Sequence, residues 1–283
     1  LNLLTFQCFS PGGTIGVAKW NGKDTPGGRY SKHAPCLPSS MLHALPIGDS
    51  ILAAIHLNLL TNETMRDVPP GKIGKPVWEQ LPESAGDTSA VENATLSHLG
   101  RLVPLARSIR LDAGGSFIIL ANGLEFPPFP ASREPTATII LKKKDELGML
   151  SASTERSLWR QLAPVTIRRR SSKDAISGPL ALMHDPRDCD VALWVGAFIT
   201  DKTNAAKIED VVEACYRIPR SMLDAPGRAA YERGVQHAEE AELALIQAVK
   251  AYASELKVAS PAYDRARQQF WTRVEQSLSA LFD

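Results

Sequence analysis

The chain has 283 residues, of which 44% are hydrophobic and 22% are charged. This composition is ordinary for a globular protein and excludes intrinsic disorder over the whole chain. The length allows one large domain or two smaller ones. The formal net charge of +1 neither indicates nor excludes a nucleic-acid partner. Basic runs at Lys142–Lys144 and Arg168–Arg170 fit phosphate contacts and solvated surface equally well.

The cysteines and the hydropathy pattern bear on the compartment. The four cysteines form no C-x-x-C pair, and a chain of this length does not need disulfide staples. We therefore expect reduced thiols and a cytoplasmic protein. No apolar run is long enough for a membrane span, so we expect no membrane partner. The sequence starts at Leu1, and we expect its natural start to lie elsewhere.

The first sixty residues combine a loop-rich stretch with one clear helix signal. Residues 1–9 are apolar and fit a helix end or a strand, whereas residues 10–40 are rich in glycine and proline. So long an irregular stretch is usually functional or disordered. Asp49 or Ser50 can cap a helix, because the apolar residues from Ile51 to Leu60 recur at helical spacing.

The middle of the chain predicts short strands. Residues 61–98 are polar and look like a surface crossing or linker. We expect a turn at Asn122-Gly123, a short helix at Leu158–Leu162 and a buried strand at Val191–Ile199. Four short β-branched runs predict further strands: Ile109–Leu111, Ser116–Ala121, Thr136–Leu141 and Val165–Arg169.

The pattern changes to long helices near residue 220. Apolar residues keep helical spacing from Tyr231 to Leu256 and again from Tyr263 to Leu281, with Ser260-Pro261 as a helix start between them. This predicts an antiparallel helical hairpin. The expected fold class is α+β: a mixed N-terminal domain with short antiparallel strands over residues 1–219, followed by a C-terminal helical hairpin over residues 220–283. The hairpin either packs on the first domain or is part of a larger helical bundle.

Two loops are candidate contact points. In Pro11-Gly12-Gly13-Thr14-Ile15-Gly16, the missing side chains would let the backbone approach a narrow surface such as a DNA minor groove. Taken alone, the local sequence of this loop favours a tight turn. The stretch Phe198–Ala206 carries Lys202 and Asn204, which suit phosphate and base-edge contacts. Its plain interpretation is a strand-to-helix turn.

Candidates for catalysis are few. His33 and Cys36 have the spacing of a metal-ligand pair without a second pair, and a Cys–His nucleophile using Cys8 or Cys36 has no supporting motif. His184 with Asp185, Asp188 and Asp190 fits either a polar turn or a metal site. No P-loop or dinucleotide fingerprint occurs. We predict no catalytic residue, no metal and no cofactor.

Taken in order, these motifs resemble the large subunit of the type I-E CRISPR Cascade complex, the CasA family. The resemblance spans most of the chain, and its specificity lies in the order of short motifs. The terminal hairpin is similar to the first half of the family's helical bundle. The other matching stretches are Thr5–Phe9 with Pro11-Gly12-Gly13, Gly48–Thr61, Pro76-Val77-Trp78, Phe117–Pro130, Ser157-Leu158-Trp159 and Leu193–Ala206.

The resemblance implies a function in RNA-guided antiviral defence, as part of a ribonucleoprotein complex. The family's large subunit reads the protospacer-adjacent motif (PAM) in double-stranded target DNA, mainly from the minor groove. It helps to open the duplex beside that motif and recruits a helicase-nuclease, without catalysis of its own. Its partners are the other Cascade subunits with their CRISPR guide RNA, which reads the target by base pairing.

The resemblance also implies DNA-binding roles for particular residues. Gly12, Gly13 and Gly16 match the family's glycine loop. Lys202, Thr203 and Asn204 match the loop whose amide side chain wedges into the duplex, where the family commonly has glutamine. The family's lysine finger matches Asp112–Ser116, which contains no lysine, and Arg110 is the nearest basic residue.

The family has a longer N-terminal part with a further DNA-contacting loop. We therefore expect this sequence to be a fragment or to lack internal segments. Two other functions stay open from the residues alone. One is a thiol- or metal-dependent hydrolase using Cys36 and His33 or the His184 cluster. The other is a structural adaptor that binds protein without DNA.

Overall fold

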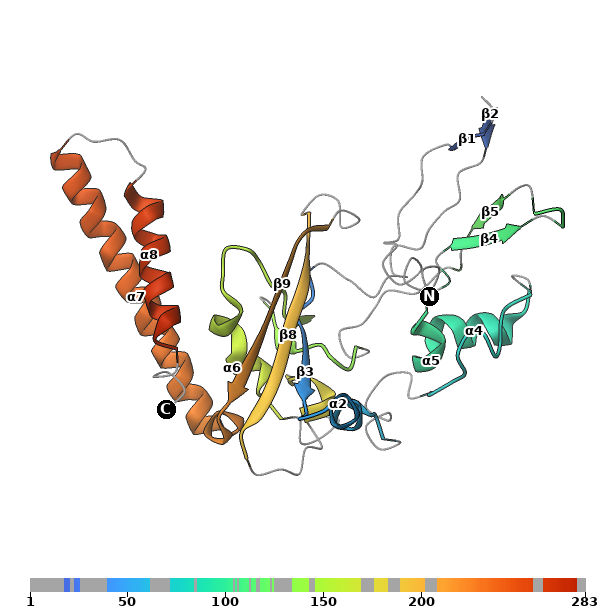
Figure 1. Cartoon of the computed structure of the whole chain (residues 1–283), viewed down its shortest axis with the longest axis horizontal. Helices are drawn as coiled ribbons and strands as arrows, with labels where there is room; N and C mark the ends of the chain where they lie inside the picture. The colour runs from blue at the N-terminus through green and yellow to red at the C-terminus, as the bar shows by residue number, and fades with distance from the viewer. Residues whose placement is uncertain are drawn as a thin grey trace.

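A computed structural model of the chain describes residues 18–20, 23–25, 40–61, 72–83, 86–103, 105, 107–111, 113–115, 118–122, 124, 134–142, 146–168, 176–182, 189–201, 208–256 and 262–278. Its fold is α+β, with short antiparallel strands and helices followed by a C-terminal helical region (Figure 1). The predicted fold class is confirmed. No helix in the described ranges is long and apolar enough to cross a membrane.

A three-stranded antiparallel sheet forms the centre, in the order β3-β8-β9 (Figure 1). The middle strand, β8 (Val191–Thr200), is the predicted buried strand. Its neighbours are β3 (His43–Ile47) and β9 (Ile208–Ile218). The register aligns Ile47 with Ala192 and Ala192 with Arg217, so these three residues form one cross-strand row.

The inner face of this sheet carries the hydrophobic core. Alternate residues of β8 turn inward as the two-residue period of a strand requires, and Val191, Leu193 and Val195 are fully buried. They pack with residues of η3 (Leu158–Gln161) and α6 (Leu162–Val165) in one cluster. Trp159, which no solvent reaches, is the largest side chain in that cluster. Removing the apolar side chains of this cluster from water is the main stabilising contribution here.

Smaller elements surround the sheet. Each of three strand pairs forms a separate two-stranded antiparallel ladder: β1 (Ala18–Trp20) with β2 (Lys23–Thr25), β4 (Arg107–Leu111) with β5 (Ile118–Asn122), and β6 (Ile139–Leu141) with β7 (Leu147–Met149). The described ranges before residue 219 also contain the short helices α2 (Ile51–Asn58), α4 (Thr88–Leu96), α5 (His98–Arg101) and η4 (Leu180–Leu182).

The C-terminal region is a helical hairpin. After η5 (Arg220–Leu223), α7 (Ala225–Glu255) runs for 31 residues and α8 (Ala262–Gln276) returns along it (Figure 1). Only Tyr231, Val235, Glu242 and Ala253 of α7 are buried. Glu242 accepts a hydrogen bond from Arg267 of α8, which ties the two helices together.

The hairpin joins the core through a compact polar and aromatic junction. The Tyr231 hydroxyl donates to the backbone carbonyl of Trp159. Arg160 donates to Glu239 of α7 at 2.6 Å, and its guanidinium lies 3.9 Å from the ring centroid of Trp271 of α8. Arg160 therefore contacts both helices at once, which is a cation–π and charge-assisted arrangement.

Several sequence predictions are confirmed and others are wrong. The Ser50 cap, the short helix at Leu158–Leu162 and the long C-terminal helices are confirmed. The described part of the predicted strand Val165–Arg169, which ends at Arg168, is not a strand, because Val165 completes the helix Leu162–Val165 and fills the core with Leu162. The expected linker at 61–98 contains α4, which Asp87 caps.

Candidate nucleic-acid interface

The ends of β8 and β9 frame the loop that holds the predicted wedge. The ladder runs regularly to Ile199 paired with Asp210, and the next pair is Thr200 with Ile208. Glu209 is therefore an extra residue on β9, a β-bulge at the base of the loop. Bulges bend and re-aim a strand, and they are common beside functional sites. The element after this loop is a strand, so the alternative prediction of a strand-to-helix turn is wrong.

Ser40 anchors the end of β8. Its hydroxyl accepts a hydrogen bond from the Thr200 N–H at 3.0 Å and lies 3.3 Å from the Thr200 hydroxyl. Its own carbonyl accepts from the Ala152 N–H at 2.9 Å. Ser40 has a φ of +59°, the left-handed region that L-residues seldom adopt. These bonds join Ser40, at the end of the glycine-rich stretch, to Thr200, which lies two residues before Lys202. No sequence signal predicts this link.

Six of the seven predicted DNA-binding residues lie outside the described part of the chain. These are Gly12, Gly13, Gly16, Lys202, Thr203 and Asn204. The structure describes the frame of the second loop, from Asp201 back along β8 and from Ile208 along β9.

Arg110, the seventh predicted residue, lies on a separate hairpin. Its backbone pairs with Ile119 in the β4–β5 ladder. The loop of that hairpin is the stretch matched to the lysine finger, and Gly115 there has a φ of +66°. Asn122 is the last residue of β5, opposite Arg107, and Gly123 of the expected Asn122-Gly123 turn lies outside the described residues.

A polar chain of three side chains lies beside β3. The Thr136 hydroxyl donates to Glu134 Oε1 at 2.6 Å, and His43 Nδ1 is 2.7 Å from the Thr136 oxygen. Because the hydroxyl has only one proton, His43 Nδ1 must be the donor in the second bond. Burial lowers the pKa of His43, and the charge of Glu134 opposes this only in part.

This arrangement does not support hydrolytic chemistry. In a nucleophilic triad the imidazole lies between the acid and the hydroxyl and removes the hydroxyl proton. Here the hydroxyl lies between the acid and the imidazole. Among the described residues, no group of three His, Cys, Asp or Glu side chains could hold a metal ion.

The hydrolase candidates found in the sequence gain little from the structure. Cys8, His33, Cys36, His184, Asp185 and Asp188 lie outside the described ranges. Asp190 has a structural role instead. Its carboxylate accepts from Arg217 Nε and from the Arg220 backbone N–H, each at 3.1 Å. These bonds fix the start of β8 against the end of β9.

The chain is thus an α+β protein with a bulged central hairpin and C-terminal helices. The profile of the family "CRISPR-associated protein Cse1 (CRISPR_cse1)" matches residues 1–283. The chain belongs to this family, as its resemblance to CasA predicted. CasA/Cse1 of Thermus thermophilus is 28% identical over 251 residues, which cover 84% of this chain and 45% of that protein.

Solved structures share the fold. The structure of Thermus thermophilus CasA (Cse1) superposes with a TM-score of 0.57 at 21% identity, covering 96% of this chain and 64% of that one. A chain of a structure described as a CRISPR RNA-guided surveillance complex gives a TM-score of 0.59 at 17% identity, covering 98% of this chain and 55% of that one. The chain thus spans about half the length of its relatives.

Proposed function

We propose that this chain is the DNA-recognition subunit of an RNA-guided antiviral complex of the Cascade type. It reads the protospacer-adjacent motif in duplex DNA, helps to open the duplex beside it, and recruits a helicase-nuclease. The observation that carries the proposal is the match of the Cse1 family over the whole chain. Its similarity to a chain of an RNA-guided surveillance complex supports assembly with other subunits and guide RNA.

The frame of the β8–β9 loop supports a contact role for Lys202, Thr203 and Asn204. A rigid, buried strand ends at Thr200, where a bulge and the Ser40 anchor hold the base of the loop. Short loops on rigid strands are suited to present side chains to a duplex. Inserting the Asn204 amide would cost a few kcal/mol of base unstacking, which contacts to the opened strands must offset.

The glycine loop is the second part of the proposed interface. Gly12, Gly13 and Gly16 would let backbone groups reach into the minor groove, where side chains would not fit. Arg110 is a third contact, with a phosphate as its target. The proposal assigns no catalysis to this chain, so strand cutting belongs to the recruited nuclease.

The test is target binding by a reconstituted complex. The chain is assembled with the other Cascade subunits and guide RNA, and the dissociation constant for matched duplex DNA is measured at several salt concentrations. Lys202→Ala should weaken binding and lower the slope of affinity against salt by about one ion. Asn204→Ala should weaken binding to duplex DNA more than to a target already opened beside the motif, because the wedge is needed only for opening.

Lys250→Ala is the matched charge control, because Lys250 lies on α7, outside the proposed interface. Its affinity and salt slope should equal those of the unmodified chain. Equal target binding by complexes with and without the chain would overturn the proposal. A chain that assembles but whose Lys202 and Asn204 variants bind DNA normally would instead be a structural adaptor.

A further inference from the structure

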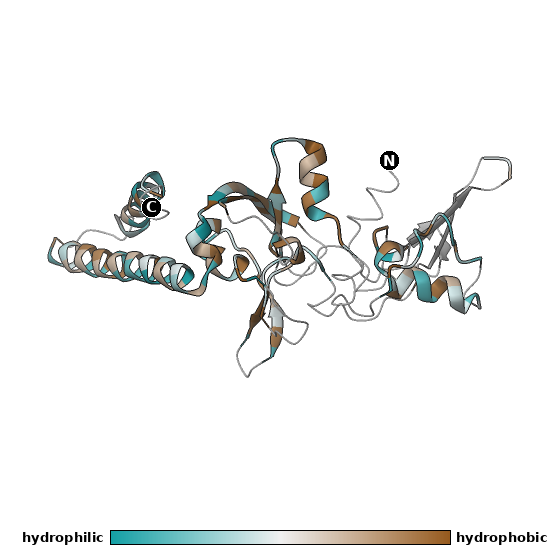
Figure 2. Cartoon of the chain, turned by 90° about the horizontal axis from the view of Figure 1, so that it is seen from below, coloured by the Kyte–Doolittle hydropathy of each residue, from teal (hydrophilic) through white to brown (hydrophobic). Residues whose placement is uncertain are grey.

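Helix α2 is apolar on every side, yet none of its residues is buried. All of its residues except His56 and Asn58 are apolar. Ile51 is 83% exposed and Leu52 is 63% exposed, and Ile55 and Leu59 are also exposed. In Figure 2, brown covers most of this helix where it stands out from the sheet. A helix that is hydrophobic all round normally lies inside a protein, so this one requires a cover.

Polar contacts at both ends hold the helix in place, and its exposed apolar side chains take no part in them. The Ser50 hydroxyl caps its first turn by accepting from the Ala53 N–H at 3.1 Å. At the other end, Asn58 Nδ2 donates to the carbonyls of Pro46 and Ala54, each at 2.8 Å. The turn between β3 and α2 is tight, because a Cβ at Gly48 would lie 2.6 Å from that of Ala53. The outward side chains are therefore free to contact another molecule.

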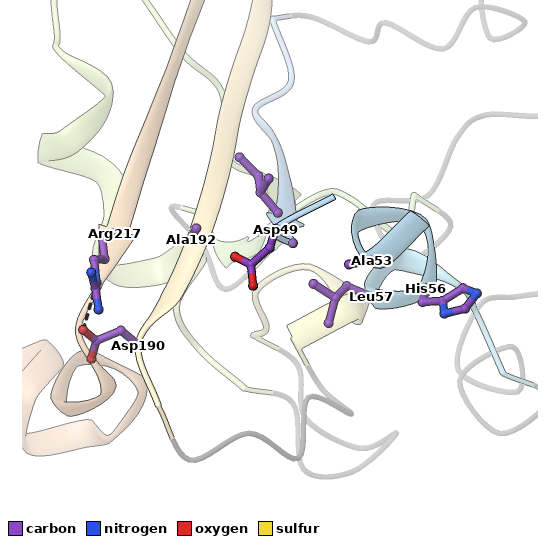
Figure 3. A pocket seen from close by; sticks show the side chains of 9 residues that line it. Asp49, Ala53, His56, Leu57, Asp190, Ala192 and Arg217 are labelled. Carbon is purple, nitrogen blue, oxygen red and sulfur yellow. Dashed lines mark hydrogen bonds and ion pairs between the residues drawn. The ribbon is translucent and has the colours of Figure 1, made fainter. Parts of the chain in front are cut away.

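A groove of about 600 Å³ continues this surface between α2 and the outer face of the sheet (Figure 3). Its floor is the cross-strand row of Ile47, Ala192 and Arg217, and Leu57 of α2 points into it. The carboxylate of Asp190 is occupied by Arg217 and the Arg220 N–H. Asp49, in contrast, forms no ion pair with any residue of the described ranges, and its carboxylate lies between β8 and α2 (Figure 3).

The chemistry of this surface selects its partner. A nucleic acid would be repelled, because the described lining residues offer an unpaired carboxylate and one guanidinium, which is already paired. A membrane-surface helix would carry lysines or arginines on its polar face, and α2 has neither. An apolar protein segment that carries one basic side chain matches both the exposed hydrophobic residues and the charge of Asp49.

We propose that α2 and its groove are the docking surface for a neighbouring protein subunit. That subunit inserts an apolar segment against Ile51, Leu52 and Ile55 and places a lysine or arginine beside Asp49. The inference rests on the proposed function, because the partner is sought among the other subunits of the Cascade-type complex. It assigns a role to the part of the sheet around the start of β8, which contains none of the predicted DNA-contact residues.

The first experiment measures incorporation into that complex. The double variant Ile51→Asp/Ile55→Asp places two charges in the proposed contact, and its affinity for the remaining subunits with guide RNA should fall at least tenfold. The control is Leu243→Asp, an exposed leucine on α7, which should assemble normally. Circular dichroism and hydrogen exchange of β8 verify that both variants are folded. Normal assembly of the folded double variant overturns the inference.

The second experiment identifies the occupant. A photoreactive benzoylphenylalanine at position 55 should form an adduct with one protein subunit of the complex, mapped by mass spectrometry to an apolar segment with a basic residue. Asp49→Lys should weaken incorporation more than Asp49→Asn, since it adds repulsion. Adducts only within this chain, only to a second copy or only to nucleic acid would each contradict the proposal.

The two proposals fail in distinguishable ways. If the unmodified chain does not join the complex at all, the proposed function fails and the docking partner is lost with it. If the chain joins and supports target binding while the α2 variants behave like the unmodified protein, only the docking inference fails.

Discussion

Strand β8 and helix α7 reach stability by different means. Most of the ten residues of β8 are buried, because strands flank it on both sides and the core covers its inner face. Helix α7 has 31 residues and buries four. The stability of the sheet region therefore comes from burying a broad apolar area, whereas the stability of the hairpin depends on a few contacts at its base. Substitutions should have correspondingly different effects in the two regions.

The largest difference should come from one residue type in the two settings. Leu193→Ala empties a fully buried site in β8 and should cost about 2–5 kcal/mol of unfolding free energy. Leu243→Ala on α7 removes a side chain that is 61% exposed and should stay within about 0.5 kcal/mol of the unmodified protein. Chemical denaturation measures both. Similar losses for the two variants would remove the contrast between the regions.

A smaller effect is expected at the junction between them. Arg160 is only 12% exposed in its side chain and contacts both Glu239 and Trp271, so Arg160→Ala should cost about 1–3 kcal/mol. Hydrogen exchange should accelerate in α8 and in the part of α7 around Glu239, with β8 unchanged. Arg156→Ala is the matched control, because Arg156 donates to the same carboxylate oxygen from a more exposed position. Its loss should stay below about 1 kcal/mol.

Lowering the pH should weaken the ion pairs that Glu239 forms with Arg160 and Arg156 at the junction. Burial alone would raise the pKa of Glu239, but the hydrogen bonds and charges of Arg160 and Arg156 outweigh it and hold that pKa below its ordinary 4.5. The stabilisation is therefore present above pH 4.5 and is lost as the pH falls through the lowered folded-state pKa. The stability difference between the unmodified protein and Glu239→Gln should be largest near neutral pH and should disappear in acid. A difference that stays constant with pH would contradict this.

The sequence predicts the elements that have a strong local signal. The helix after Ser50 has a cap and helical spacing, and the run Val191–Ile199 is apolar and bounded by polar residues. Strand β3 escapes prediction because Pro46 is unusual inside a strand, and it is tolerated here since β3 is an edge strand. In β9, Val212, Ala214, Tyr216 and Ile218 do alternate, but acidic residues and the bulge obscure the pattern at its start.

The candidate site shows a similar limit. Order along the chain is enough to match loops to a family, because that comparison needs only sequence. The anchoring of Thr200 by Ser40 joins residues 160 positions apart and leaves no local pattern. The sequence does not predict the exposure of α2 either, because the apolar sequence of that helix alone predicts burial.

The pairing of His43 with Gly196 in the β3–β8 ladder has a consequence for synthesis on the ribosome. The two residues lie roughly 150 positions apart, so at about 5–20 residues per second β3 waits about 8–30 s for its partner to be made. Throughout that interval both β3 and the apolar helix beside it are exposed. Nascent chains that have not yet reached Thr200 should therefore associate with chaperones through the segment around residues 43–59, and release should follow synthesis of β8 and β9.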